Sequence, residues 1–378
     1  MATPQETLGQ RIRAARKRLG ITQADLAQRV GFSAHQIVSQ IEKGRRDVRA
    51  WELAKIAKVL RVEFSSLLSE TGFAPEPMVL WRERPRGEAE EIEAGFLKRC
   101  REYHWLEELC DIESPGRFPR YDADAYSART LEVAKLAKMV GNQLNLGARP
   151  ATSLAKILEE VYGAKIWYER LKNDGSGACV IGDFGPAMLV NSGESPWRRN
   201  YDIAHELFHL LTWESFPPES LYEDNQLNRA VERAADTFAS WLLLPADAVL
   251  TEFDRYRELG AIKYSTIVQM ARDFDVSTEA LLWRLERLGR ILASEVERVL
   301  NDSAFRSVDK ATMHEGWWTP AEPPERFVRL AFFAYQRGGL SRARLAELLD
   351  TSLFNLTDKL LRYDLDDRED YETEISSS

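Results

Sequence analysis

The sequence predicts a mainly helical protein with one small β-sheet. This α+β chain would contain an N-terminal helical bundle, a central core that holds the sheet, and a helical C-terminal region. Apolar residues recur at helical spacing over most of the 378 residues, and three short strand-like runs, separated by Gly and Asp, lie between residues 164 and 190. With 44 % apolar and 10 % aromatic residues, the chain is large enough to bury two or three cores.

Composition excludes several other classes of protein. No stretch approaches eighteen consecutive apolar residues, and the basic N-terminus has no apolar signal core behind it, so we expect neither a membrane span nor secretion. The three cysteines, Cys100, Cys110 and Cys179, are odd in number and widely spaced, which favours neither a disulfide framework nor a CxxC metal pair. We therefore expect a cytoplasmic protein.

Charge is divided unevenly along the chain. Residues 1–70 carry 13 Lys or Arg against 7 Asp or Glu, whereas the remaining residues carry 38 against 53. A small basic module tethered to an acidic body is the pattern expected if only the N-terminus meets phosphate groups.

The basic module is predicted to contain four short helices punctuated by glycine. The first ends at Gly20, and Thr22 with Asp25 forms a capping box for the second, which ends at Gly31. A third helix closes at Gly44, and the fourth follows it. Ser33 and Gln36 are predicted to cap the start of the third helix.

Residues 8–68 resemble an Xre/Cro-type helix-turn-helix domain, through TQADLAQRVGFSAHQIVSQIEKGRRDV followed by LAKIAKVLRV. The resemblance implies a double-stranded DNA operator as partner, with the third helix in the major groove, and a homodimer on paired half-sites. Candidates for contacts with base edges are His35, Gln36 and Gln40, and candidates for phosphate contacts are Gln23, Ser39, Lys43, Arg45 and Arg46. Gln36 cannot fully serve both as cap partner and as base contact.

The run His205-Glu206-Leu207-Phe208-His209 lies in an apolar helical segment and predicts a metal site. Four residues along a helix rise about 6 Å and bring both imidazoles to one face, where they can reach one Zn²⁺. Glu206 would lie beside the metal and take a proton from the attacking water. The alternative is a pair of core histidines around a structural glutamate, but burying these groups without a metal would be costly.

A catalytic zinc needs a third protein ligand, and Glu232 is the candidate. It lies 23 residues after His209, and Asp236 follows one helical turn later, where it could accept the outer N–H of a ligand histidine. The alternative for Glu232 and Asp236 is an exposed acidic stripe. Because the positions around them are apolar, the sequence favours a role for both residues at the metal site over an exposed stripe.

These motifs, together with the strand runs before them, resemble the ImmA/IrrE family of metallopeptidases over residues 120–250, through the AHELFHLL helix and a glutamate helix ending in LLLP. Where the family usually has a second Glu and an Asn, this chain has Ala234 and Asp236, which leaves the ligand Glu232 in place. The resemblance implies a zincin-like core, Zn²⁺, and cleavage of one partner protein, a repressor or antitoxin, in response to stress or another signal.

Several points stay open at this level. The strand AMLV at 187–190 is a candidate sheet edge for a substrate peptide, and the group that stabilises the oxyanion could be Tyr201, Tyr222 or His314. The chain could instead be a non-proteolytic repressor whose peptidase-like domain senses a small effector, with the helices of 247–362 sensing or dimerising, or one member of a toxin–antitoxin pair.

Four segments are expected along the chain. Residues 1–70 would form the DNA-binding domain, 71–120 a linker and connecting helix, 121–250 the zinc metallopeptidase-like domain, and 251–378 a helical C-terminal region with an acidic tail.

Overall fold

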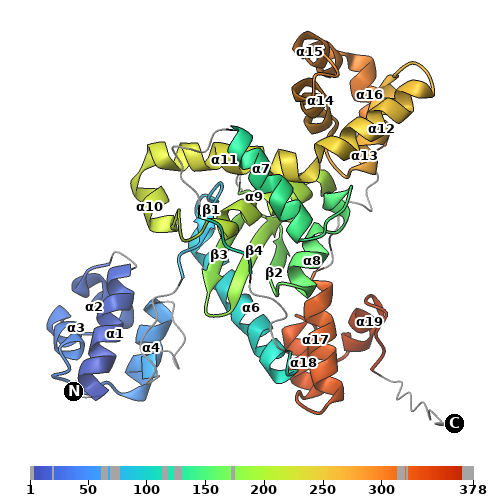
Figure 1. Ribbon diagram of the computed structural model, residues 1–378. Coiled ribbons are helices and arrows are strands. Elements are labelled where there is room, and N and C mark those ends of the chain that lie inside the picture. Colours follow the sequence, from blue (N-terminus) through green and yellow to red (C-terminus); the bar gives the residue numbers. More distant parts are fainter. Residues whose placement is uncertain are drawn as a thin grey trace. The chain divides into compact units, whose positions relative to one another are not determined.

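A computed structural model describes residues 4–18, 21–60, 67–68, 77–112, 118–122, 130–171, 175–312, 320 and 322–367. The chain divides into two compact units, Met1–Pro77 and Met78–Ser378 (Figure 1). The predicted α+β class is confirmed, since helices dominate and one small sheet lies in the second unit. Among the described residues, no helix combines the length and apolarity needed to cross a bilayer.

The first unit contains the helices α1 (Pro4–Arg18), α2 (Gln23–Val30), α3 (His35–Glu42) and α4 (Ala50–Leu60). The capping box of Thr22 and Asp25 is confirmed, and Gly31 ends α2 with a left-handed φ of 85°. Gly20 lies outside the described residues. The predicted cap by Ser33 and Gln36 is wrong, because the extended N-cap residue is Ala34, which leaves Ser33 one position too early.

The second unit contains a sheet with the strand order β1-β3-β4-β2. Its strands are β1 (Leu80–Trp81), β2 (Lys165–Glu169), β3 (Ala178–Gly182) and β4 (Gly185–Asn191). β3 and β4 form an antiparallel hairpin, β1 pairs antiparallel with β3, and β2 runs parallel to β4. The three predicted strand runs are therefore confirmed. However, the expectation that AMLV forms a sheet edge is wrong, because β4 lies between β3 and β2.

Side chains of the sheet alternate between two helical layers, as the two-residue period of a strand requires. Ile166, Cys179 and Met188 enter one core, whereas Trp167 and Val180 enter the other. The helical segments of the first layer are α7 (Thr130–Gln143), η1 (Pro150–Thr152), α8 (Leu154–Glu160), α9 (Pro196–Leu211) and α11 (Asn225–Leu243). The helices of the second are α6 (Ala89–Leu109), α17 (Glu325–Gln336), α18 (Arg342–Leu348) and α19 (Leu356–Leu361).

The chain therefore leaves the sheet after β4 and returns to its opposite face more than a hundred residues later, where α17 packs beside α6 (Figure 1). Between these passages lie α10 (Pro218–Glu223), α12 (Ala246–Glu258), α13 (Tyr264–Asp273), α14 (Thr278–Arg287), α15 (Ala293–Asn301) and α16 (Ser303–Ala311). β1 and α6 belong to this second unit although both fall within 71–120, the segment expected to be a linker and connecting helix. The four-segment division stays a prediction.

Candidate metal centre and nucleic-acid interface

Helix α9 carries His205, Glu206 and His209 through the interior of the second unit. Pro196 starts its first turn, and every residue from 202 to 211 is buried. Because residues four apart share one helix face, the two imidazoles face the same way, and their Nε2 atoms lie 3.2 Å apart. The spacing in the sequence thus becomes a close pair of nitrogen donors.

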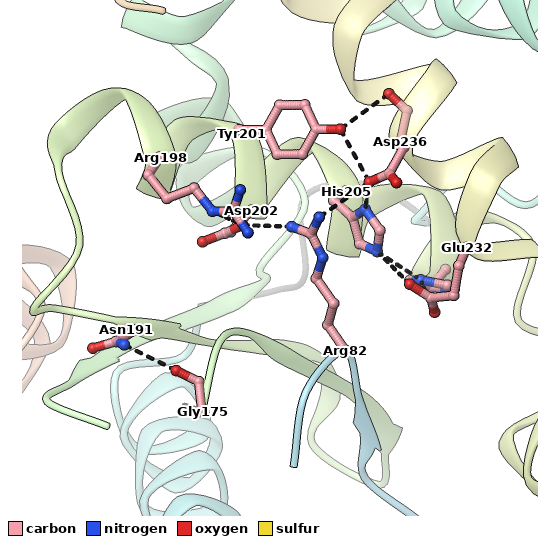
Figure 2. A network of polar contacts seen from close by, with 10 residues as sticks. Arg82, Gly175, Asn191, Arg198, Tyr201, Asp202, His205, Glu232 and Asp236 are labelled. Carbon is pink, nitrogen blue, oxygen red and sulfur yellow. Dashed lines mark hydrogen bonds and ion pairs between the residues drawn. The ribbon is translucent and has the colours of Figure 1, made fainter. Parts of the chain in front are cut away.

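Helix α11 packs along α9 and brings Glu232 to this pair. One carboxylate oxygen of Glu232 lies 3.2 Å from His205 Nε2, and the other lies 3.4 Å from His209 Nε2. These contacts join the three residues that the sequence predicted as ligands. Figure 2 shows two of them, His205 and Glu232, facing each other.

The three donors fit a zinc ion. Tetrahedral zinc with ligands at about 2.0–2.1 Å separates any two donors by about 3.3 Å, close to the 3.2 Å and 3.4 Å found here. Two imidazoles and one carboxylate leave a fourth position for water or substrate. Within the described ranges, this is the one group of three or more His, Cys, Asp or Glu that could hold a metal.

Glu206 is fully buried beside this cluster, and neither of its carboxylate oxygens has a hydrogen-bond partner among the described residues. Burying a carboxylate without hydrogen-bond partners costs free energy, and a water molecule or a cation bound next to the Glu206 oxygens would lower that cost. Gly177, which precedes β3, makes the position possible, because a Cβ there would lie 2.9 Å from Glu206 Oε1.

Asn191 at the end of β4 fixes the backbone around Gly177. Its amide donates to the carbonyl of Gly175 at 2.9 Å (Figure 2). Its side-chain oxygen accepts from the backbone N–H of Leu171 and Gly193. The buried amide thereby ties the approach to β3 to the strand beside it.

Asp236 lies on the outer side of His205, as the sequence predicted. Its carboxylate is 3.0 Å from His205 Nδ1, and it also accepts from the hydroxyl of Tyr201 at 3.0 Å. Burial opposes ionisation of Asp236, but the contacts with His205 outweigh it and lower the pKa of the carboxyl. Burial likewise lowers the pKa of His205, yet its bonds to Asp236 and Glu232 raise it to about 9. A metal would therefore compete with a proton for this imidazole.

Arg82 completes the network and was missed by sequence reasoning. Its guanidinium, which reaches from the end of β1 over the ring of Tyr201, donates to Asp202 at 2.8 Å and to Asp236 at 3.1 Å (Figure 2). Asp202 is fully buried and also pairs with Arg198 at 3.2 Å. No periodicity in the run WRERPRG marks Arg82, so only the pairing of β1 with β3 reveals its place.

The three oxyanion candidates differ in where they lie. Tyr201 bonds Asp236 and is therefore near the metal cluster. The hydroxyl of Tyr222 donates to the carbonyl of Val79 and accepts from the N–H of Trp81, so it holds the outer edge of β1. His314 lies outside the described residues.

A cavity of about 600 Å³ opens beside the network, between α9, α11 and α14. Arg82, Arg198, Tyr201 and Asp236 line one side of it, and Trp283 lines the other. The cavity borders the outer network of Tyr201 and Asp236, and none of the three ligand candidates lines it. Of those three, Glu232 is the most exposed, with 26 % of its side chain open to solvent.

The first unit presents most of its predicted DNA contacts on its surface. His35, Gln36 and Gln40 on α3 are exposed, as are Lys43 and Arg45 just after it. Because Ser33 does not cap α3, Gln36 is not engaged as a cap partner.

Three other predicted contacts are half-buried, and two of these make bonds within the unit. Gln23 donates to Glu42 at 2.7 Å, and Arg46 donates to Glu52 at 2.7 Å. Ser39, also half-buried, lies on α3. To contact phosphate, Gln23 and Arg46 would have to give up or share their bonds to Glu42 and Glu52. The exposed Lys43 has no such bond among the described residues.

Comparison with known protein families gives two matches. Residues 12–67 match the helix-turn-helix family, and residues 159–286 match the family described as the IrrE N-terminal-like domain. The second match spans β2 to α14 and so includes both helices of the metal cluster. No curated protein matches the chain.

Proposed function

Because the chain joins a helix-turn-helix DNA-binding domain to a metallopeptidase-type domain of the IrrE N-terminal-like kind, we propose a specific regulatory function. It is a DNA-binding transcriptional regulator whose second domain is a zinc-dependent endopeptidase that cleaves one partner protein, a repressor or antitoxin, in response to stress or another signal. The observation that carries this proposal is the cluster of His205, His209 and Glu232 with the unpartnered carboxylate of Glu206 beside it.

Zinc held by His205, His209 and Glu232 would supply a Lewis acid that polarises the scissile carbonyl and makes water a stronger nucleophile. Glu206 takes the proton from the attacking water and passes it to the leaving amine. Asp236 accepts the Nδ1–H of His205, which keeps Nε2 free to act as a ligand. Arg82 in turn holds the carboxylate of Asp236 in place.

The DNA-binding part of the proposal assigns base contacts to His35, Gln36 and Gln40. Phosphate contacts are assigned to Gln23, Ser39, Lys43, Arg45 and Arg46. A homodimer on paired half-sites would double this surface. A regulator of this kind acts in the cytoplasm, where its operator and partner protein are both available, and the three cysteines are free.

Zinc content provides the first test. The purified wild-type chain should carry about one zinc per chain, and Glu206→Gln should carry the same, because Glu206 is not a ligand in this proposal. Both proteins should bind the same DNA, selected from a random duplex library. A wild type that stays metal-free in zinc-replete buffer would contradict the metal assignment.

Cleavage is tested separately by profiling new protein N-termini in cells that express either the wild type or Glu206→Gln. Fragments of one partner should arise with the wild type and disappear with the variant. If the two profiles coincide under all stresses applied while zinc is bound, the domain is not a protease under those conditions and the effector-sensing alternative replaces it.

A further inference from the structure

A second cavity, separate from the metal cluster, lies between α7, the end of α11 and α12. It has a volume of about 760 Å³, within the range of small-molecule sites. Its wall is largely apolar and includes Ala137, Gly141, Trp241, Leu242 and Phe274. Nothing in the proposed peptidase mechanism uses it.

Arg284 of α14 lines this cavity and is only 1 % exposed. Its Nε donates to the carbonyl of Leu244 at 2.9 Å, and its guanidinium carbon lies 3.8 Å above the ring of Trp241. Both terminal nitrogens, Nη1 and Nη2, have no hydrogen-bond partner in the part of the chain that the structure describes. Four N–H donors of a buried cation are thus without an acceptor.

The acidic side chains of the cavity do not neutralise this cation. Asp247 pairs with Lys138 at 3.5 Å, and Glu252 pairs with Arg255. Burial, reinforced by the nearby Arg287, lowers the pKa of Arg284 to about 10, which leaves it charged at neutral pH. A buried guanidinium in this state costs free energy that an anion would recover.

We propose that this cavity binds a small molecule with a single carboxylate on an apolar body. The two terminal nitrogens of a guanidinium present parallel donors that match the two oxygens of a carboxylate. Leu242 and Phe274 supply apolar surface for the remainder of the ligand. Arg284 is the buried cation of the wall. The other cations that line the cavity are exposed, namely Lys135, Lys138 and Arg149. A single buried guanidinium favours a monoanion over a dianion.

This proposal goes beyond the proteolytic function and does not depend on it, because ligand binding in the cavity can be measured whether or not the chain is a protease. Glu232 and Trp241 lie on the same helix, α11, so zinc content is measured in every variant to separate loss of the cavity from loss of the metal centre.

The probe is 3-phenylpropionate, titrated by calorimetry into the full-length protein. We expect saturable binding, with 3-phenylpropionamide, acetate and phenyl phosphate each binding at least tenfold more weakly. The amide lacks the charge, acetate lacks the apolar body, and the phosphate is a dianion. An amide or a phosphate that binds as tightly as the carboxylate overturns the assignment, as does a wild type that binds none of the four.

Variants locate the site. Arg284→Met should weaken binding of 3-phenylpropionate at least tenfold. Arg287→Met removes an exposed cation one turn along α14 that acts on Arg284 only through its charge, and it should change binding less than about twofold. Gly141→Leu keeps Arg284 and fills the cavity from α7, where a Cβ meets only Leu242 at 3.6 Å. It should also abolish binding, and it tests the site even if Arg284→Met fails to fold. Undiminished binding by folded Gly141→Leu or Arg284→Met contradicts the proposal.

Discussion

The candidate DNA contacts and the candidate metal ligands lie in opposite environments. His35, Gln40 and Lys43 are exposed on or just after one short helix, whereas His205 and His209 are 0 % and 3 % exposed in the core of the second unit. A surface contact needs only the helix that displays it. Buried histidine ligands also need partners for their polar groups, and here those partners come from α11 and from Arg82 just after β1. A substitution at the metal cluster should therefore disturb more neighbouring residues than a substitution on the DNA-binding surface.

The largest effect is expected at His209. Replacing a ligand removes one of three protein donors, so His209→Ala should lower zinc affinity more than about a hundredfold, beyond the effect of an outer-sphere change. Chelator competition measures the loss, and DNA affinity should stay the same. A drop in DNA affinity of equal size would show that the two units are not separable.

Gly177→Ala should lower turnover about a hundredfold under the proposed function, because the new Cβ would lie 2.9 Å from Glu206 Oε1 and displace that carboxylate. Zinc should stay bound. Cleavage of the partner found by N-terminal profiling provides the measurement.

Gly95→Ala is the matched control for this change, since a Cβ there meets nothing within 4 Å in helix α6. It should retain full turnover. Normal turnover in Gly177→Ala as well would remove Glu206 from the proposed mechanism.

Arg82→Met tests whether a residue that contacts the metal ligands only through Asp236 contributes to zinc binding. Asp236 and Asp202 each lose a partner, although Asp202 keeps Arg198. We expect zinc affinity to fall about tenfold and the free energy of unfolding to fall by about 1–3 kcal/mol.

Arg84→Met provides the control for Arg82→Met, because the Arg84 side chain is 53 % exposed and pairs only with Glu93 among the ion pairs of the described residues. Its free energy of unfolding, measured with denaturant, and its zinc affinity, measured by chelator competition, should both stay close to the wild-type values. If the two variants lost equal zinc affinity and stability, the cause would be the removal of one positive charge and not the loss of the bonds from Arg82 to Asp202 and Asp236.

The smallest effect is expected at Lys43 in the first unit. Lys43→Ala should weaken DNA binding several-fold for every sequence and lower the slope of log affinity against log salt by about 1. Gln40→Ala should instead change which bases are selected. Zinc content should not move in either variant, and a sequence-selective loss in Lys43→Ala would reassign that residue to base contact.

Features that depend on a few neighbouring residues were predictable. The capping box of Thr22 and Asp25, the helical end at Gly31 and the paired imidazoles of His205 and His209 all follow from hydrogen bonds or helix periodicity over four residues or fewer. The Ser33 cap failed because one residue of extended chain, Ala34, shifts the start of α3. The exact first residue of a helix is decided by backbone angles that side-chain patterns constrain only weakly.

Composition and helix periodicity are properties of short stretches, so the fold class and the two segments that match known families could be read from the sequence, and the candidate motif residues with them. The packing of the chain is what brings Arg82 to Asp236 across 154 residues, makes room for Glu206 at Gly177, and places Arg284 at an apolar cavity without an acceptor among the described residues. It also placed β4 inside the sheet and brought α17 back to its far face. These contacts join segments far apart in the chain, and the packing of whole layers selects them, which no local pattern records.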